Sequence, residues 1–208
     1  MKVVLATRNQ GKVKEFRELL AELDIEIMGL DQFPQIGDIE ETGLTFSENA
    51  ALKAEIVTFS TGLPTVADDS GLEVDALGGA PGVNSARFAG VHGDDRANNE
   101  KLLELMSGVT ELRTGRFRCA IAICVPAGKD TEAVTKIIKT HIVEGSCEGK
   151  IGWKAVGQHG FGYDPLFIPD GYEITMGQMD DVEKNKISHR AKAVAKAIDI
   201  LKELESDH

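Results

Sequence analysis

The N-terminal part of the chain alternates between apolar runs and polar stretches. Residues 3–6 are continuously apolar, which is typical of a strand buried on both faces. A polar stretch follows at residues 7–12, and from Val13 to Leu23 apolar residues recur at helical spacing. A second apolar run at residues 25–30 predicts another strand. This order of strand, loop, helix and strand predicts the beginning of an α/β fold.

A capping signal indicates where the next helix begins. Residues 31–43 contain Pro34, Gly37 and Gly43 and predict a long surface loop. Thr45 and Glu48 have the T-x-x-E form, in which each side chain satisfies a backbone N–H group at the start of a helix. Gly62 is typical of a helix end, and Pro64 follows it. We therefore expect a helix between Thr45 and Gly62.

The rest of the chain predicts a mixed set of elements. They are a short strand at 65–67, a helix at 94–106, a hairpin of 117–125 and 136–143 joined by a polar loop with Pro126 and Gly128, an irregular glycine-rich stretch at 145–162, and one closing helix with an apolar stripe from Ile187 to Leu201. A hairpin beside strand–helix units indicates an α/β fold with a mixed central β-sheet and flanking helices. Without repeats or linkers, residues 1–208 are predicted to form a single domain.

Composition narrows the possible partners. The chain of 208 residues has 23 Lys and Arg against 34 Asp and Glu, a formal net charge of −11. This balance argues against nucleic acid and against an anionic membrane surface as partners. The cysteines Cys119, Cys124 and Cys147 lack metal-site spacing and are expected to be buried free thiols. Without an apolar leader or a long apolar run, the protein is predicted to be cytoplasmic.

The polar stretch at residues 7–12 is a candidate phosphate-binding loop. Backbone N–H groups at a helix N-terminus suit an anion, and Arg8 and Lys12 add positive charge. The Walker pattern fails, however, because Ala6 and Val13 stand where that pattern needs glycine and serine or threonine. An ordinary connecting loop remains the alternative interpretation.

Two pairs of adjacent carboxylates are candidate cation ligands. Asp68 and Asp69 follow a predicted strand, and Glu40 and Glu41 lie in the predicted long loop. Carboxylate oxygens are hard ligands that suit a hydrated Mg²⁺. Neighbouring residues of an extended segment point in opposite directions, so Asp68 and Asp69 are not expected to face the same side without a turn. An Asp-rich turn and a solvated surface remain the alternatives.

An aromatic pair and a basic cluster complete the candidate set. Phe161 lies between Gly160 and Gly162, and Tyr163 follows Gly162 and precedes Asp164. The two rings could stack a base. Residues 184–190, at the predicted start of the closing helix, are the densest basic patch of the chain. Core packing of the rings and solvated charge at a helix end are the alternatives.

Six sequence blocks in one order closely resemble the inosine triphosphate pyrophosphatase family, whose members act on non-standard purine nucleotides. The blocks are Thr7-x-Asn9-x-x-Lys12, Glu41-Thr42-Gly43-x-Thr45-Phe46-x-Glu48-Asn49-Ala50, Ala67-Asp68-Asp69-Ser70-Gly71-Leu72, Leu77-Gly78-Gly79-Ala80-Pro81-Gly82, Phe161-Gly162-Tyr163-Asp164-Pro165 and Ile187-Ser188-His189-Arg190. The resemblance implies hydrolysis of ITP, dITP and XTP to the monophosphate and diphosphate with Mg²⁺. It also implies an elongated two-lobed subunit with the active-site cleft between the lobes, and a homodimer.

The resemblance also implies roles for particular residues. Asp69 is expected to be the general base and a metal ligand, and Glu40 a second metal ligand, with the adjacent Glu41 as the alternative. The residues expected to bind the substrate are Thr7, Arg8, Asn9, Gln10, Gly11, Lys12, Lys53, Ser70, Phe161, Gly162, Tyr163, Asp164, Lys184, His189 and Arg190.

Three other functions are compatible with parts of this pattern. They are a pyrophosphatase for other nucleotides such as modified pyrimidines, a nucleotide sensor without catalysis, and an acidic interaction module without a ligand. The Asp68-Asp69-Ser70 sequence argues against a sensor, because a protein that only binds a nucleotide needs no general base.

Overall fold

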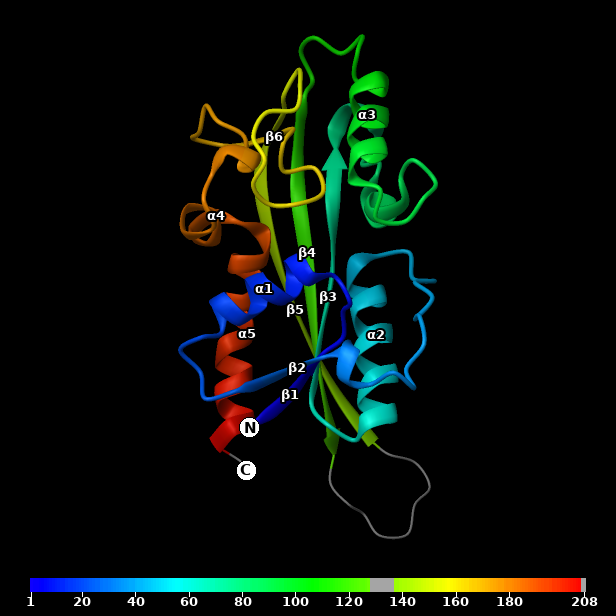
Figure 1. Cartoon of the computed structure of the whole chain (residues 1–208), viewed down its shortest axis with the longest axis vertical. Helices are drawn as coiled ribbons and strands as arrows, with labels where there is room; N and C mark the ends of the chain where they lie inside the picture. Colours follow the sequence, from blue (N-terminus) through cyan, green and yellow to red (C-terminus); the bar gives the residue numbers. More distant parts are fainter. Residues whose placement is uncertain (128–136, 207–208) are drawn as a thin grey trace. The chain divides into compact units, whose positions relative to one another are not determined.

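A mixed β-sheet forms the framework of the protein in the computed structural model, which describes residues 1–127 and 137–206 (Figure 1). Among these residues the sheet has six strands in the order β2-β1-β3-β4-β5-β6. The strands are β1 (Lys2–Leu5), β2 (Glu26–Gly29), β3 (Thr65–Val74), β4 (Thr114–Ala127), β5 (Ile137–Ile151) and β6 (Phe167–Pro169). β1 pairs in parallel with β2 and β3, whereas β5 and β6 are antiparallel. The predicted mixed sheet is confirmed.

Helices accompany the strands along the chain. They are α1 (Gln10–Leu19), α2 (Phe46–Thr61), α3 (Asp95–Leu105), α4 (Asp181–Ile187) and α5 (His189–Ser206). The predicted hairpin strands correspond to β4 and β5. The placement of Pro126 in the loop between them is wrong, because Pro126 belongs to β4. Residues 128–136, which include Gly128 of the predicted loop, lie outside the described residues.

The chain divides into two compact units. Unit 1 comprises Met1–Asp69, Ala120–Glu144 and Ala193–His208, and unit 2 comprises Ser70–Cys119 and Gly145–Lys192. The chain passes from one unit to the other within β3, β4, β5 and α5, and never through a linker. The predicted single domain, its two lobes and the cleft between them stay predictions.

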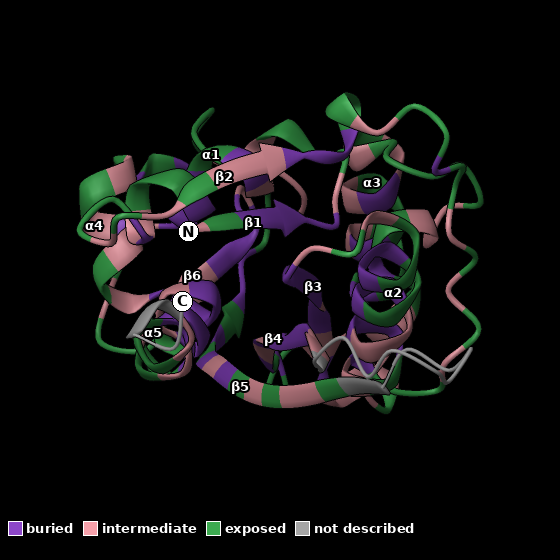
Figure 2. Cartoon of the chain, turned by 90° about the horizontal axis from the view of Figure 1, so that it is seen from below, coloured by how far each residue is buried: buried purple, intermediate pink, exposed green. Residues whose placement is uncertain are grey.

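Unit 1 contains the elements that the sequence predicts best. The side chains of Val3, Val4 and Leu5 in β1 are buried, as the apolar run predicts. The capping box of α2 is present, because Thr45 accepts from the Glu48 N–H while the Glu48 carboxylate accepts from the Thr45 N–H. Figure 2 shows that α2 and α5 turn their buried sides toward the strands and their exposed sides outward.

Unit 2 has its own apolar core. Its members come from β3, α3, β4, β5 and the segment after β5, and they include Leu72, Leu102, Met106, Phe117, Leu166 and Phe167. The buried Arg113 guanidinium donates hydrogen bonds to the carbonyls of Met106, Val109, Ile151 and Gly152. These bonds join the end of α3 to the end of β5. They also give buried carbonyls hydrogen-bond partners in place of water.

Three further sequence predictions about element boundaries are wrong. The strand predicted at 65–67 continues to Val74, so the acidic pair lies inside β3 rather than at its carboxyl end. The predicted irregular stretch from residue 145 instead continues β5 as far as Ile151. The closing helix is broken at Ser188, whose backbone is extended and whose hydroxyl accepts from the Ala191 N–H as a helix cap does.

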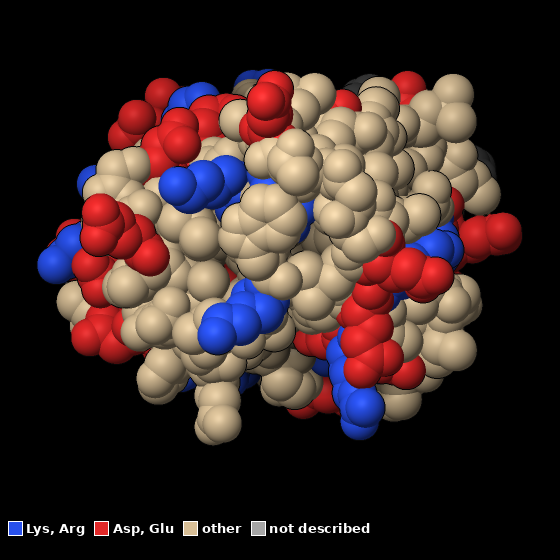
Figure 3. Space-filling model, turned by 90° about the horizontal axis from the view of Figure 1, so that it is seen from above, with Lys and Arg blue, Asp and Glu red and all other residues tan. Residues whose placement is uncertain are grey.

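Three features of the structure bear on the predictions from composition: the charged side chains of the surface, the three thiols and the apolar character of the helices. On the face drawn in Figure 3, acidic and basic side chains are interspersed among uncharged atoms. Cys119, Cys124 and Cys147 are buried free thiols, as predicted. Within the described ranges, no helix has the length and apolar character needed to cross a bilayer.

Candidate active site

Asp69 lies at the centre of a buried polar cluster in unit 1. The Lys53 ammonium from α2 donates to Asp69 Oδ1 at 2.9 Å, to Glu41 Oε1 at 2.8 Å and to the Asp68 carbonyl at 2.9 Å. Asn49, one turn earlier on α2, donates from Nδ2 to Asp69 Oδ2 at 3.3 Å. Both carboxylate oxygens of Asp69 therefore have fixed partners, which hold the carboxylate in one orientation.

The electrostatics of this cluster shift the pKa values of both Asp69 and Lys53. Burial raises the pKa of the Asp69 carboxyl above its ordinary value, and the nearby Glu41 carboxylate adds to the rise although Lys53 opposes it. Burial alone would lower the pKa of Lys53, but the two carboxylates outweigh that effect and raise it. Lys53 is therefore an ammonium ion, whereas Asp69 is a stronger base than an exposed aspartate.

Asp68 has a different lysine as its partner. Its fully buried carboxylate forms an ion pair with Lys12 of α1, while Asp69 faces Lys53. The two aspartates thus have separate partners, as expected for neighbouring residues of an extended strand. The parallel pairing of β1 with β3 brings the segment after β1 beside this part of β3. The segment after β1 and the acidic pair in β3 are far apart in the sequence, and the order of the strands brings them together.

The predicted phosphate loop consists of the connection between β1 and α1 together with Gln10, Gly11 and Lys12, the first residues of α1. Asn9 caps α1 and its Oδ1 accepts from the N–H groups of Gly11 and Lys12 at 2.9 and 3.2 Å. Thr7 Oγ1 accepts from the Asn9 N–H, and Gln10 bonds back to the Arg8 carbonyl. The turn is ordered by its own side chains, so a phosphate could use these N–H groups only in place of Asn9.

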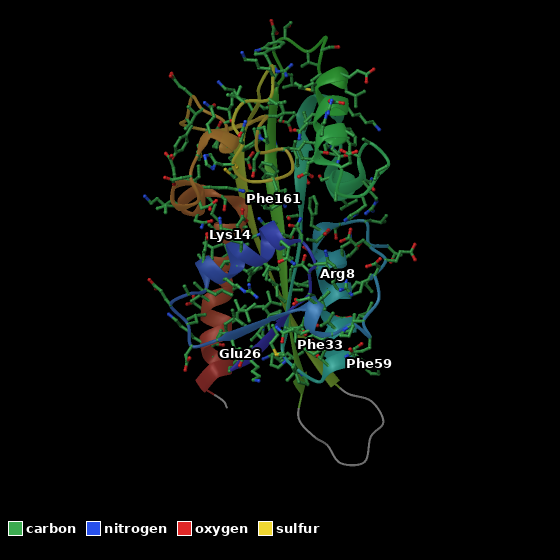
Figure 4. The ribbon with its side chains drawn as sticks, viewed as in Figure 1. Arg8, Lys14, Glu26, Phe33, Phe59 and Phe161 are labelled. Carbon is green, nitrogen blue, oxygen red and sulfur yellow. The ribbon has the colours of Figure 1, made fainter. Side chains whose placement is uncertain are left out.

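The long loop contributes Glu41 to the cluster rather than Glu40. Glu40 is exposed, whereas Glu41 is half-buried against Lys53. Arg8, labelled in Figure 4, donates to the Ile36 carbonyl and lies 3.7 Å from the Asp38 carboxylate. Arg8 thus contacts the same loop. The assignments of Glu40 to a metal and of Arg8 to a substrate stay predictions.

The aromatic and basic candidates come together in unit 2. Phe161 N–H donates to Asp164 Oδ2 at 2.9 Å, and the buried Lys184 ammonium donates to the same oxygen at 2.7 Å. Lys184 Nζ and Arg190 Cζ lie 4.8 and 5.6 Å from the centre of the Phe161 ring. Arg190 also donates to Ser70 Oγ at 2.8 Å. The side chain of Asp164 orients its neighbours, which is a positioning role.

Two predicted residues of this group lie in the core. His189 stacks on Phe117 with ring centres 4.8 Å apart, and its side chain is buried. The Tyr163 hydroxyl donates to the Ser85 carbonyl at 2.9 Å, and burial raises the pKa of that hydroxyl. For Tyr163 the core-packing alternative therefore describes its surroundings. Their assignments to substrate binding stay predictions.

The structure also reveals polar residues that the sequence analysis missed. Asn49 fixes Asp69, and Asp95 and Asn99 of α3 bond to the peptide groups around Gly162. The signals were present as spacing: Asn49 and Lys53 are four residues apart on α2, and so are Asp95 and Asn99 on α3. Without knowledge of which face each helix buries, this spacing has no special meaning.

A mixed sheet with flanking helices, in which two adjacent aspartates of β3 each pair with a lysine, defines this chain as an α/β protein with a buried charged cluster. The Ham1 family model matches residues 3–200, and the chain belongs to the Ham1 family. This finding and the relatives described next confirm the family resemblance seen in the six sequence blocks.

Relatives and solved structures cover nearly the whole chain. A dITP/XTP pyrophosphatase of Desulforamulus reducens is 51% identical over 98% of this chain and 97% of its own length. A dITP/XTP pyrophosphatase of Listeria monocytogenes is 48% identical over 99% of this chain and 94% of its own. The structure of a HAM1 protein from Coxiella burnetii has a TM-score of 0.83 at 39% identity, covering 98% of this chain and 99% of that one.

Proposed function

We propose that this protein hydrolyses non-standard purine nucleoside triphosphates, namely dITP, XTP and ITP, to the nucleoside monophosphate and diphosphate. The observation that carries the proposal is the buried Asp69 carboxylate between Lys53 and Asn49, in a chain about half identical to proteins named dITP/XTP pyrophosphatase. Removal of such nucleotides from the nucleotide pool is the consequence of this activity.

Asp69 is proposed as the general base for the attacking water. Its carboxylate takes the proton as the water oxygen bonds to the α-phosphorus, and the bond from that phosphorus to the bridging oxygen breaks, which releases diphosphate. Burial raises the pKa of Asp69, which makes the carboxylate a better proton acceptor. Lys53 and Lys12 are proposed to offset the negative charge of the triphosphate.

Mg²⁺ is proposed as the cofactor, and the residues present fit it. Glu41 Oε1 and Asp69 Oδ1 converge on one ammonium nitrogen, so their hard oxygen atoms already face a cation. When bound, the ion would stabilise charge on the phosphate oxygens. Asp69 would hold it together with Glu41 or the predicted Glu40. In the described residues no three acidic, His or Cys side chains gather as a ligand set, so phosphate and water would complete the coordination.

Base selectivity is proposed to come from Phe161, Lys184 and Arg190. Hypoxanthine and xanthine have an oxygen acceptor at C6 that either cation can meet, whereas adenine has an amino donor there. A buried cation left without its acceptor discriminates by roughly 10⁴-fold or more. Ser70, Asp164 and the neighbouring residues of the loop are proposed to hold these groups in place.

Product analysis tests the proposal directly. dITP, XTP, ITP, GTP and ATP are each incubated with the protein and Mg²⁺, and diphosphate is separated from orthophosphate. We expect IMP and diphosphate from ITP, and turnover of ATP lower by several orders of magnitude. Orthophosphate as the product would contradict the proposed bond cleavage, and equal turnover of all five nucleotides would contradict the proposed base site.

Asp69→Asn tests the general base. The amide keeps the size of the side chain but has no proton-accepting carboxylate, so kcat should fall by about 10²–10⁴-fold while nucleotide binding remains. Single-turnover kinetics and binding of dITP measured by calorimetry separate the two effects. The control is Asp24→Asn, which changes an exposed carboxylate that is not among the predicted site residues. Turnover of Asp69→Asn at the wild-type rate would refute the assignment.

A cytoplasmic homodimer is the proposed form of the protein. The dimer is supported by the family resemblance alone, and the exclusion of nucleic acid by the net charge of −11. Sedimentation equilibrium at micromolar concentration should give twice the 22.4 kDa chain mass. A monomer mass over that range would contradict the proposed dimer.

A further inference from the structure

Two side chains of helix α3 bind the loop that contains Phe161. One contacts the N–H group of Gly162, and the other contacts its carbonyl. The Gly162 N–H donates to Asp95 Oδ2 at 2.7 Å, and Asn99 Nδ2 donates to the Gly162 carbonyl at 2.8 Å. Asp95 and Asn99 are one helical turn apart and therefore share a face of α3. The two peptide groups that flank Gly162 are thus fixed by one rigid element.

The two side chains are themselves held in place. Asn99 Nδ2 also donates to the Asp95 carbonyl at 2.7 Å. Asp95 is the first residue of α3, and the preceding Asp94 caps the helix by accepting from the Ala97 N–H at 2.9 Å. The bond from Gly162 to the Asp95 carboxylate is charge-assisted, which makes it stronger than a bond between neutral groups.

The loop needs such support because its backbone is unusual. Gly160 and Gly162 have φ angles of +74° and +61°, in the left-handed region that glycine adopts more readily than other residues because it has no Cβ atom. Phe161 lies between them, so a rotation of either glycine would swing its ring. Asp164 fixes the Phe161 N–H from inside the loop, and α3 fixes the other side.

We propose that Asp95 and Asn99 are positioning residues that hold Phe161 as the platform of the base site. This inference rests on the proposed function and deepens it. The pair acts on recognition of the purine rather than on the chemistry at phosphorus, because its bonds reach the loop of Phe161 and not the cluster of Asp69. Loss of either bond frees the Gly162 peptide groups and weakens binding of the base.

Calorimetric titration of the wild type and of Asn99→Asp with two ligands tests the proposal. IMP probes the base site, and inorganic tripolyphosphate with Mg²⁺ probes the triphosphate cluster. Asn99→Asp replaces the donor to Gly162 by a carboxylate that repels the carbonyl. The expected result is about a tenfold loss of IMP affinity with unchanged tripolyphosphate affinity, and an increase in KM for dITP with kcat within about twofold of the wild type.

Two further variants complete the experiment. Asp95→Asn keeps the size and an acceptor oxygen but removes the charge, so it should show a smaller loss in the same direction, and it replaces Asn99→Asp if that variant does not fold. Glu104→Gln, an exposed residue of the same helix, is the matched control and should match the wild type.

The outcomes separate the two proposals. If the wild type binds IMP, and neither Asn99→Asp nor Asp95→Asn weakens that binding in the folded state, the positioning role is overturned. The proposed function is then unaffected. Equal loss of IMP and tripolyphosphate affinity would also overturn it, because a general structural defect would then explain the result. A wild type that neither binds IMP nor hydrolyses dITP would overturn the proposed function, and the inference with it.

Discussion

Asp68 and Asp69 show how much the surroundings of a residue decide. They are adjacent and chemically identical, yet Asp68 pairs with Lys12 and Asp69 with Lys53. Alternation along β3 points them to different partners, and each carboxylate has a lysine that offsets the cost of burial. The same pairs explain why β3 continues through residues that are common in turns.

Replacement of Lys53 by methionine should destabilise the protein strongly. The variant leaves the buried Asp69 and the half-buried Glu41 without their shared cation, and we expect the free energy of unfolding to fall by about 3–5 kcal/mol at neutral pH. Urea unfolding measures it. The control is Lys14→Met on the exposed side of α1, 3.9 Å from Glu18, which should change it by less than about 1 kcal/mol. Similar values for both variants would contradict the role of Lys53.

The buried Cys147 should make stability depend on pH in the alkaline range. Burial raises the pKa of its thiol from an ordinary value of 9.0 to about 11. The folded state therefore keeps this proton longer than the unfolded state, so its contribution is complete below pH 9 and is lost as the pH rises through 11. Urea unfolding of the wild type and of Cys147→Ala should show a smaller decline in the variant, by up to about 3 kcal/mol. Parallel pH profiles would contradict this.

Among the elements, α2 is the one whose sequence and structure agree most closely. Its capping box and its left-handed end at Gly62 both follow from local pattern. The helix in turn places Asn49 and Lys53 on the side that faces Asp69. The capping signals that define α2 therefore also define the helix on which Asn49 and Lys53, the partners of Asp69, lie.

Thr45→Ala tests the contribution of the cap. The Glu48 N–H loses the acceptor that the Thr45 hydroxyl supplies, and the free energy of unfolding should fall by about 1 kcal/mol. Thr45→Ser keeps the hydroxyl and is the matched control, with an expected change of less than about 0.5 kcal/mol. Chemical denaturation distinguishes the two variants. An equal loss in both would show that the methyl group, and not the cap, matters.

At the scale of the whole molecule, the division into units does not follow the order of the sequence. The chain crosses between the units at residues 69–70, 119–120, 144–145 and 192–193, each time inside a strand or helix. Domains that fold alone are usually joined through exposed linkers. Continuous elements instead make the stability of one unit depend on the other.

Unfolding should therefore be a single cooperative transition. Trp153, the one tryptophan of the sequence, belongs to unit 2 and stacks under the Arg113 guanidinium at 4.0 Å, so its fluorescence reports on that unit. Far-ultraviolet circular dichroism reports on the helices of both units. The two urea curves should coincide within error. A Trp153 transition at a separate urea concentration would contradict the single-domain prediction.

The sequence by itself determined the apolar strand β1, helix α2 with both of its ends, the mixed sheet and the family. The strand and the helix depend on local periodicity and on capping chemistry, which neighbouring residues carry in full. The family follows from six sequence blocks in one order. It also gave the residue types of the site, because charge and hydrogen-bonding capacity belong to the side chain itself.

Tertiary structure alone decided the partners. The length of β3, the choice of Glu41 beside Lys53, the pairing of Lys12 with Asp68 and the hold of α3 on Gly162 depend on which faces meet across the sheet. Such contacts join residues far apart in the chain. Their energies come from burial and from the loss of water around charges, and neither quantity is defined until the chain has folded.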